Sequence, residues 1–113
     1  MHTRSADGRV VPLARPNRPA LVLSDLAELT GPTEGTVEPP QRLCWTPPHR
    51  FNLATRDDLR WMYEIVLREA IHADELRRFL HGPTLRDIWP ELNLPRGVRQ
   101  AWEAHHPQLR RAA

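Results

Sequence analysis

The chain has 113 residues, which is about the length of one domain, and its formal net charge is only +2 although it holds 16 basic residues. All 16 are arginine, and the single cysteine excludes an internal disulfide framework and a cysteine-based zinc site. Because the sequence also has no apolar run long enough to span a membrane and no secretory leader, we expect a soluble cytoplasmic protein with no membrane partner.

Charge and proline content divide the chain into four segments. Residues 1–20 hold four arginines, one aspartate and three prolines, and we expect them to form a flexible basic arm. Residues 21–55 are acidic, with four acids against two arginines. The remainder is nearly balanced, with ten arginines and nine acids, and is predicted to form a helical body over 56–109 and a basic tail over 110–113.

The acidic segment is predicted to hold a short helical turn followed by an extended, proline-rich ribbon. Ser24 or Asp25 suits the N-cap position of that turn. From 36 to 45 the chain has β-branched and aromatic residues, but the proline pair at 39–40 cannot donate to a strand ladder. We therefore expect either an edge strand or two short strands joined at a bend, lying on the helical body.

The clearest helix signal opens the helical body. Thr55 precedes acidic residues that suit the first turn of a helix. Apolar residues then recur at spacings of three and four, which predicts one amphipathic helix from about 56 to 72. The stripe expected to face the core comprises Leu59, Met62, Tyr63, Val66, Leu67, Ala70 and Ile71.

Three shorter helices are predicted to follow. Their expected first and last markers are, in order, Asp74 and Gly82-Pro83, Thr84 and Pro90, and Asn93 and Pro107. The predicted fold is thus mainly α: a small bundle of one long and three short helices, with an N-terminal extended ribbon packed on it.

Histidines and acids offer one candidate metal site. Glu69, His72 and Glu75 lie three residues apart, so they would share one face of an unbroken helix. A closed zinc site needs four ligands, and a new helix is predicted to start within this set. We interpret the three side chains as a solvated polar corner and expect no metal.

The search for a nucleophile gives one weak candidate. Cys44 lies five residues from His49, but no glycine elbow or helix start is near enough to lower the pKa of the thiol. The loop at 31–35 has two glycines but no lysine, so it is not a phosphate-binding loop. We expect no enzymatic activity and no cofactor.

Nucleic-acid binding is the alternative function that the sequence allows. Residues 74–89 have the outline of a helix-turn-helix, but the second helix is too short and too apolar to read bases. The last predicted helix is a better candidate, because Arg96, Arg99 and Gln100 lie opposite its apolar face, although they would equally suit a solvated face. Together with the basic arm, these residues would make a DNA-binding transcriptional regulator.

One tryptophan points instead to a protein partner. Trp61 falls off the apolar stripe of the long helix and lies beside Arg60, with Arg68 two turns further on. Tryptophan, tyrosine and arginine dominate binding hot spots, so Trp61 is interpreted as an interface anchor. The competing interpretation is that the ribbon around Trp45 folds over Trp61 and completes the core.

Three stretches of the sequence resemble a family of small antitoxin-like proteins of high-GC bacteria that are encoded beside nucleotidyltransferase-type toxins. The stretches are LTGPTEGTVEPP at 29–40, WMYEIVLREA at 61–70 and IWPELNLPRGVRQAWE at 88–103. The likeness covers most of residues 21–109 and consists of packing signatures, so no functional residues are carried over. The resemblance implies an antitoxin that neutralises its partner toxin, with autoregulation of its operon as a second implied role.

The combined expectation is a non-enzymatic binding protein whose partner is a toxin encoded by a neighbouring gene. A nucleotide-transferring toxin would have a positive or metal-bearing pocket. The acidic segment around Glu28, Glu34 and Glu38 is expected to occlude that pocket by charge complementarity. The residues predicted to contact the partner are Arg60, Trp61, Arg68, Glu34, Glu38 and Trp45.

Overall fold

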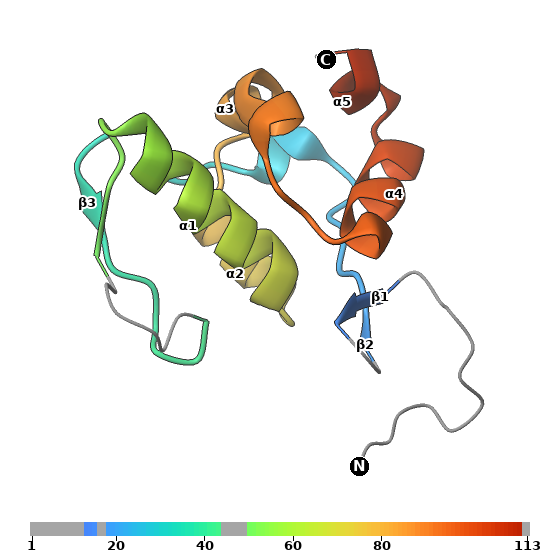
Figure 1. Ribbon diagram of the computed structural model, residues 1–113, viewed down its shortest axis with the longest axis horizontal. Helices are drawn as coiled ribbons and strands as arrows, with labels where there is room; N and C mark the ends of the chain where they lie inside the picture. The colour runs from blue at the N-terminus through green and yellow to red at the C-terminus, as the bar shows by residue number, and fades with distance from the viewer. Residues whose placement is uncertain (1–12, 16–17, 44–49, 112–113) are drawn as a thin grey trace.

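In the part of the chain that the structure describes, five α-helices form most of the molecule and two small antiparallel strand pairs flank them (Figure 1). The computed structural model describes residues 13–15, 18–43 and 50–111. The helices are α1 (Arg56–Glu69), α2 (Ala73–Phe79), α3 (Gly82–Ile88), α4 (Arg96–His105) and α5 (Pro107–Arg111). The prediction of a mainly α protein is confirmed.

The long helix α1 buries the central part of the predicted apolar stripe, together with Ile65, which was not predicted, whereas Leu59 is half-buried. Its buried residues are Met62, Tyr63, Ile65, Val66 and Leu67. The helix ends earlier than predicted, because Ala70 is extended with a ψ of 136°. Ile71 was predicted to continue the apolar stripe and is instead 41% exposed, since helical spacing no longer applies beyond Glu69.

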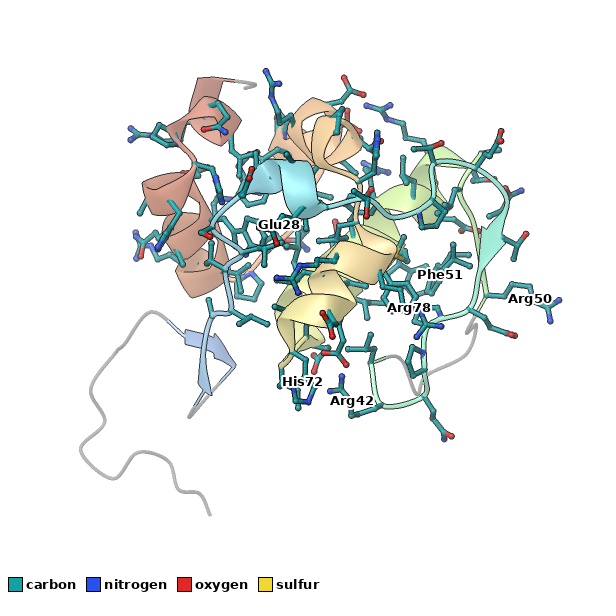
Figure 2. The ribbon with its side chains drawn as sticks, turned by 180° about the vertical axis from the view of Figure 1, so that it is seen from behind. Glu28, Arg42, Arg50, Phe51, His72 and Arg78 are labelled. Atoms are coloured by element: carbon teal, nitrogen blue, oxygen red, sulfur yellow. The ribbon has the colours of Figure 1, made fainter. Side chains whose placement is uncertain are left out.

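The start of α2 differs from the prediction. His72, and not Asp74, occupies the N-cap position. The carboxylate of Glu75 accepts hydrogen bonds from the backbone N–H groups of Ile71, at 2.9 Å, and of His72, at 3.1 Å. Arg42 forms an ion pair with the same carboxylate, and Figure 2 shows it beside the start of α2. Glu75 therefore closes the first turn of the helix, a role for which the residue type at this spacing is typical.

Gly82 does not end α2 as predicted but begins α3, with Pro83 in the first turn, where its missing N–H has no helical partner to lose. A Cβ atom at Gly82 would lie only 2.5 Å from the carbonyl oxygen of Leu26, so this close approach requires glycine. The helix ends at Ile88, and Pro90 lies in the 3-10 turn η2 (Trp89–Glu91) that follows. The interruption expected at Pro90 is confirmed.

The last predicted helix is also shifted at its start. Pro95 holds the N-cap position of α4, and Asn93 instead donates its backbone N–H to the carboxylate of Glu64 at 2.7 Å. The helix ends at His105, before Pro107 as expected. The helix α5, which includes the first two residues of the predicted basic tail, was not predicted.

The N-terminal part of the described chain contains one predicted and one unpredicted feature. Asp25 caps the 3-10 turn η1 (Leu26–Glu28), and its carboxylate accepts the backbone N–H of Ala27 at 2.9 Å. Strand β1 (Leu13–Arg15) pairs antiparallel with β2 (Arg18–Pro19) and contacts α4 and α1. The remaining residues of the predicted basic arm, 1–12 and 16–17, lie outside the described residues.

The ribbon forms a second strand pair. Strand β3 (Thr36–Val37) pairs antiparallel with β4 (Phe51–Asn52) and ends before the proline pair at 39–40, as the missing donors require. Strand β4 packs on α1. Residues 44–49, which include Cys44, Trp45 and His49, lie outside the described residues.

One apolar core joins the helices to the N-terminal segment. Its largest fully buried side chains include Trp89, Trp102, Tyr63 and Phe51. The side chain of His106, also buried, donates from Nε2 to the carbonyl oxygen of Leu23 at 2.7 Å and so ties α4 to the start of the chain. Across the described ranges, every helix is too short or too polar to cross a membrane.

Candidate partner-binding surface

Trp61 faces solvent from α1. Its side chain is 44% exposed, and among the described residues only Ile71 is a comparably exposed large apolar side chain. The indole ring packs against the buried ring of Phe51 in an edge-to-face arrangement, with ring centroids 5.7 Å apart and planes at 74°. This contact fixes the orientation of the indole but leaves much of its surface open. Whether residues around Trp45 cover it lies outside the described residues.

A shallow cavity of about 390 Å³ lies beside Trp61. Its lining consists of Asp57, Arg60, Trp61, Glu64, Glu91 and Asn93. The first four residues lie on α1 at spacings that place Asp57 and Glu64 on either side of the tryptophan along the helix. The last two come from η2 and the loop after it, so the cavity is formed only in the folded chain.

Arginines neutralise some of the acids at this cavity. Arg56 forms a two-pronged ion pair with Glu91, in which its Nε lies 3.0 Å from Oε1, and Asp87 lies 3.8 Å from the same guanidinium. The hydrogen bond from Arg56 is the main reason that the pKa of Glu91 lies below its usual value. Arg60 forms an ion pair with Asp57 and lies 3.9 Å from Glu91. Arg60, a predicted partner contact, is therefore already occupied by acids of its own chain.

Glu64 is the acid at the cavity that no arginine of the described residues neutralises. It is half-buried, and the backbone N–H of Asn93, at 2.7 Å, is its hydrogen-bond donor. Among the described residues no arginine or histidine lies within ion-pair distance of its carboxylate. A half-buried carboxylate with no cationic partner in the described ranges thus lies next to an exposed indole.

The other predicted contact on α1 is not part of this cavity. Arg68 lies nearly two turns from Trp61, and its Nε is 3.2 Å from the carboxylate of Glu69. Of the five predicted partner-binding residues that the structure describes, Arg60 and Trp61 line the cavity.

The acids of the ribbon do not form one surface. Glu38 pairs with Arg50 at 3.3 Å, whereas Glu28 pairs with Arg77 at 2.9 Å. Figure 2 shows Arg50 and Glu28 well apart on the molecule. Glu34 is exposed and has no ion pair within the described part of the chain. The acids that surround Trp61 come from α1 and η2 instead. This set was missed in the sequence because one of its three members, Glu91, reaches Trp61 only through tertiary packing.

The nucleic-acid candidates on α4 divide into two kinds. Arg99 lies over the ring of Trp89, 5.0 Å from its centroid, and pairs with Glu103 at 3.6 Å. Arg96 and Gln100 are exposed, and in the described residues Arg96 has no ion pair. Arg99 therefore belongs to the packing of α4, and only Arg96 and Gln100 remain available to a ligand.

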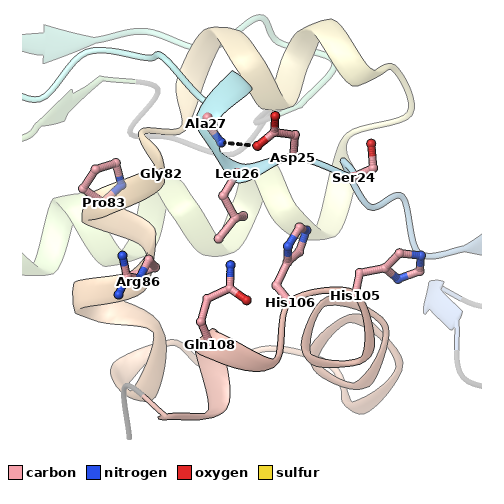
Figure 3. Close-up of a pocket in the computed structure, with 10 residues that line it drawn as sticks. All are labelled: Ser24, Asp25, Leu26, Ala27, Gly82, Pro83, Arg86, His105, His106 and Gln108. Carbon is pink, nitrogen blue, oxygen red and sulfur yellow. Dashed lines mark hydrogen bonds between the residues drawn. The ribbon is translucent and has the colours of Figure 1, made fainter.

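A second cavity, of about 530 Å³, lies between η1, the start of α3 and the junction of α4 with α5 (Figure 3). Arg86, exposed at its edge, has no ion pair with any described residue. Two other polar side chains of the lining are engaged within the chain: His105 Nδ1 lies 3.1 Å from the carbonyl oxygen of Ala101, and Asp25 caps η1. Figure 3 shows the ring of His105 turned away from the centre of the cavity.

The candidate metal cluster is not assembled as an unbroken helix face. Glu69 ends α1, His72 lies at the N-cap of α2, and Glu75 binds backbone N–H groups and Arg42. Within the described ranges no group of three or more histidine, cysteine or acidic side chains is arranged to hold a metal ion.

No known protein family, curated protein or solved structure matches this chain. The resemblance to antitoxin-like proteins thus rests on the three sequence stretches alone, and the function that it implies stays a prediction. The geometry adds an exposed indole among acids, an arrangement that suits contact with another molecule.

Proposed function

We propose that this chain is a non-enzymatic, antitoxin-like binding protein of the cytoplasm that neutralises a nucleotidyltransferase-type toxin by protein–protein contact. The observation that carries the proposal is the exposure of Trp61, at 44%, on the longest helix of the described chain. Tryptophan is the residue type most enriched among binding hot spots, and burying an exposed indole contributes a large apolar area to an interface. The bundle predicted from the sequence belongs to the proposal because it presents this face of α1.

Charge supports the same role. A toxin that transfers nucleotides needs a positive or metal-bearing pocket, and the lining of the Trp61 cavity holds three acids against one arginine. Complementary potentials speed association and select against wrong partners. In this proposal the acids around Trp61 take over the occluding role first assigned to Glu28, Glu34 and Glu38.

Co-purification with the product of the neighbouring gene tests the proposal. We expect a stable complex with the wild-type chain and at least ten-fold weaker binding by Trp61→Ala, since hot-spot truncations cost about 2 kcal/mol or more. Ile71→Ala is the matched control, because it also removes an exposed apolar side chain, at 41% exposure, but lies outside the cavity. Absence of a complex with the wild-type chain would remove the proposal.

A DNA-binding transcriptional regulator is the second candidate function. The exposed, unpaired Arg96 with Gln100 one turn further along α4 favours it. A mobility-shift assay on the upstream region of its own gene, at about 50 mM salt where phosphate contacts are strongest, tests this candidate. We expect a shift that Arg96→Ala weakens if the chain regulates its operon, and no shift at low salt would dismiss this role.

A further inference from the structure

We infer that the cavity beside Trp61 receives an arginine side chain from a basic segment of the partner protein. The inference rests on the proposed function, which supplies the partner, and it adds the chemistry by which that partner is recognised. It follows from three features of the cavity: an oriented aromatic face, a carboxylate that has no cationic partner among the described residues, and a single lining arginine that is already paired with an acid of its own chain.

The indole ring of Trp61 is already oriented in the unbound chain. Phe51 is fully buried and holds the indole of Trp61 edge to face, with ring centroids 5.7 Å apart, so binding does not have to immobilise a free side chain. An indole face is the best protein acceptor for a cation placed over it. A guanidinium is planar and weakly hydrated, so it stacks on an indole more readily than an ammonium does.

Glu64 supplies the charge that such a cation requires. Its carboxylate lies one helical turn from Trp61, is half-buried and has no cationic partner among the described residues. The bond from the backbone of Asn93, at 2.7 Å, holds one oxygen, Oε2, in place. The second oxygen remains to accept a hydrogen bond from an incoming guanidinium. On the opposite side of Trp61, Asp57 adds a further exposed carboxylate whose one partner is Arg60.

The same lining excludes an anionic ligand. Three acids face the cavity, and its single arginine, Arg60, is already bound to Asp57 and close to Glu91. A phosphate or an acidic side chain would therefore meet net negative charge, and the one arginine among the described lining residues is already paired. A cation on a protein segment is the occupant that both the indole and the charges favour.

Nuclear magnetic resonance of the full-length, nitrogen-15-labelled chain can test the inference directly. The chain has four tryptophans, and the indole N–H signal of Trp61 is identified as the one missing in Trp61→Phe. The probe is a short peptide of alternating arginine and glycine, at millimolar concentration. We expect it to shift the Trp61 signal saturably and to leave the signals of the buried Trp89 and Trp102 in place.

Variants then distinguish the contribution of the Glu64 charge from nonspecific peptide binding. Glu64→Gln keeps the acceptor for the Asn93 N–H and should weaken peptide binding about three-fold, the effect expected for one partly exposed ion pair. Asp74→Asn, in α2 and paired with Arg77, removes the same charge from another surface and should leave peptide binding unchanged. A glutamate–glycine peptide should cause no shift.

The outcomes for the inference and for the proposed function differ. A missing shift, an equal shift with the glutamate peptide, or unchanged affinity of Glu64→Gln would overturn the inference. If the neighbouring gene product still binds through Trp61 in any of these cases, the proposed function stands without it. If the arginine peptide binds as expected and the neighbouring gene product does not, the toxin proposal fails and the cavity keeps its assignment as an arginine-binding site.

Discussion

Tyr63 shows how a single polar group is accommodated in the core at the residue scale. The side chain is buried, and its hydroxyl oxygen accepts the backbone N–H of His81 at 2.8 Å. Burial raises the pKa of Tyr63 above its ordinary value of 10, and the bonds to His81 and Thr84 oppose that shift without cancelling it. The folded chain therefore keeps this proton at a pH where an unfolded chain has released it.

This difference predicts a loss of stability in alkali. Below pH 10 both states hold the proton and the contribution is fully present, whereas above pH 10 the unfolded state binds fewer protons, so stability falls as pH rises toward the folded pKa. The chain has one tyrosine, so tyrosinate absorbance reports this group alone, and it has no lysine that would titrate in the same pH range. We expect the free energy of unfolding, measured with urea, to fall above pH 10 more steeply for the wild type than for Tyr63→Phe. Parallel curves for the two proteins would contradict the account.

Trp61 and Glu64 mark how far residue-level prediction from sequence reaches. The spacing of apolar residues on α1 was enough to place Trp61 off the buried stripe, and the structure confirms it. Glu64 lies on the same helix face, but its lack of a cation depends on where Arg60 and Arg68 find their partners. Each arginine has more than one acid within reach along α1, and side-chain geometry decides which acid it pairs with. Arg60 is also near Glu91 of η2, a tertiary contact that the sequence pattern does not contain.

Helix α4 gives the first prediction at the scale of elements. Arg99 ties this helix to η2, because its guanidinium lies 5.0 Å from the centroid of the Trp89 ring and pairs with Glu103. We expect Arg99→Ala to lower the free energy of unfolding by about 1–2 kcal/mol, from the lost cation–π contact and ion pair. Arg96→Ala, at an exposed and unpaired position of the same helix, should change it by less than about 0.5 kcal/mol. Equal effects in thermal or urea unfolding would show that Arg99 is not structural.

The close contact between η1 and α3 gives the second prediction at this scale. A methyl group at Gly82 would lie 2.5 Å from the backbone oxygen of Leu26, which no side-chain rotation can relieve. We expect Gly82→Ala to lower the free energy of unfolding by about 2–3 kcal/mol through overpacking, although alanine favours helices. Arg86→Ala, on the exposed side of α3, is the control and should be nearly neutral. A Gly82→Ala protein as stable as the wild type would mean that η1 and α3 are not in this close contact.

Elements were predictable where local sequence decides them. The central part of the apolar stripe of α1, the Asp25 cap of η1 and the stops at Pro90 and Pro107 all depend on a few neighbouring residues, and each is confirmed. The wrong boundaries have tertiary causes. Gly82 looks like a helix end in sequence, but contact with Leu26 places it at a helix start. Strand β4 has only two residues and forms because β3 pairs with it. A strand this short has no sequence periodicity that would predict it.

At the scale of the whole molecule, charge is distributed by packing rather than by segment. The sequence suggested one acidic ribbon, yet Glu28 and Glu38 are each paired with a different arginine and lie apart. The negative surface lies instead at Trp61, where α1 and η2 meet, although these elements are about thirty residues apart in the chain. We propose that the partner binds at this Trp61 surface.

Growth rescue tests directly whether the chain neutralises a toxin through Trp61. Cells that express the neighbouring gene are grown with the wild-type chain, with Trp61→Ala or with Ile71→Ala, each confirmed to be folded and equally abundant. The account predicts that the neighbouring gene alone arrests growth, that the wild type and Ile71→Ala restore it, and that Trp61→Ala does not. Rescue by Trp61→Ala as complete as that by the wild type, or no growth arrest to rescue, would contradict it.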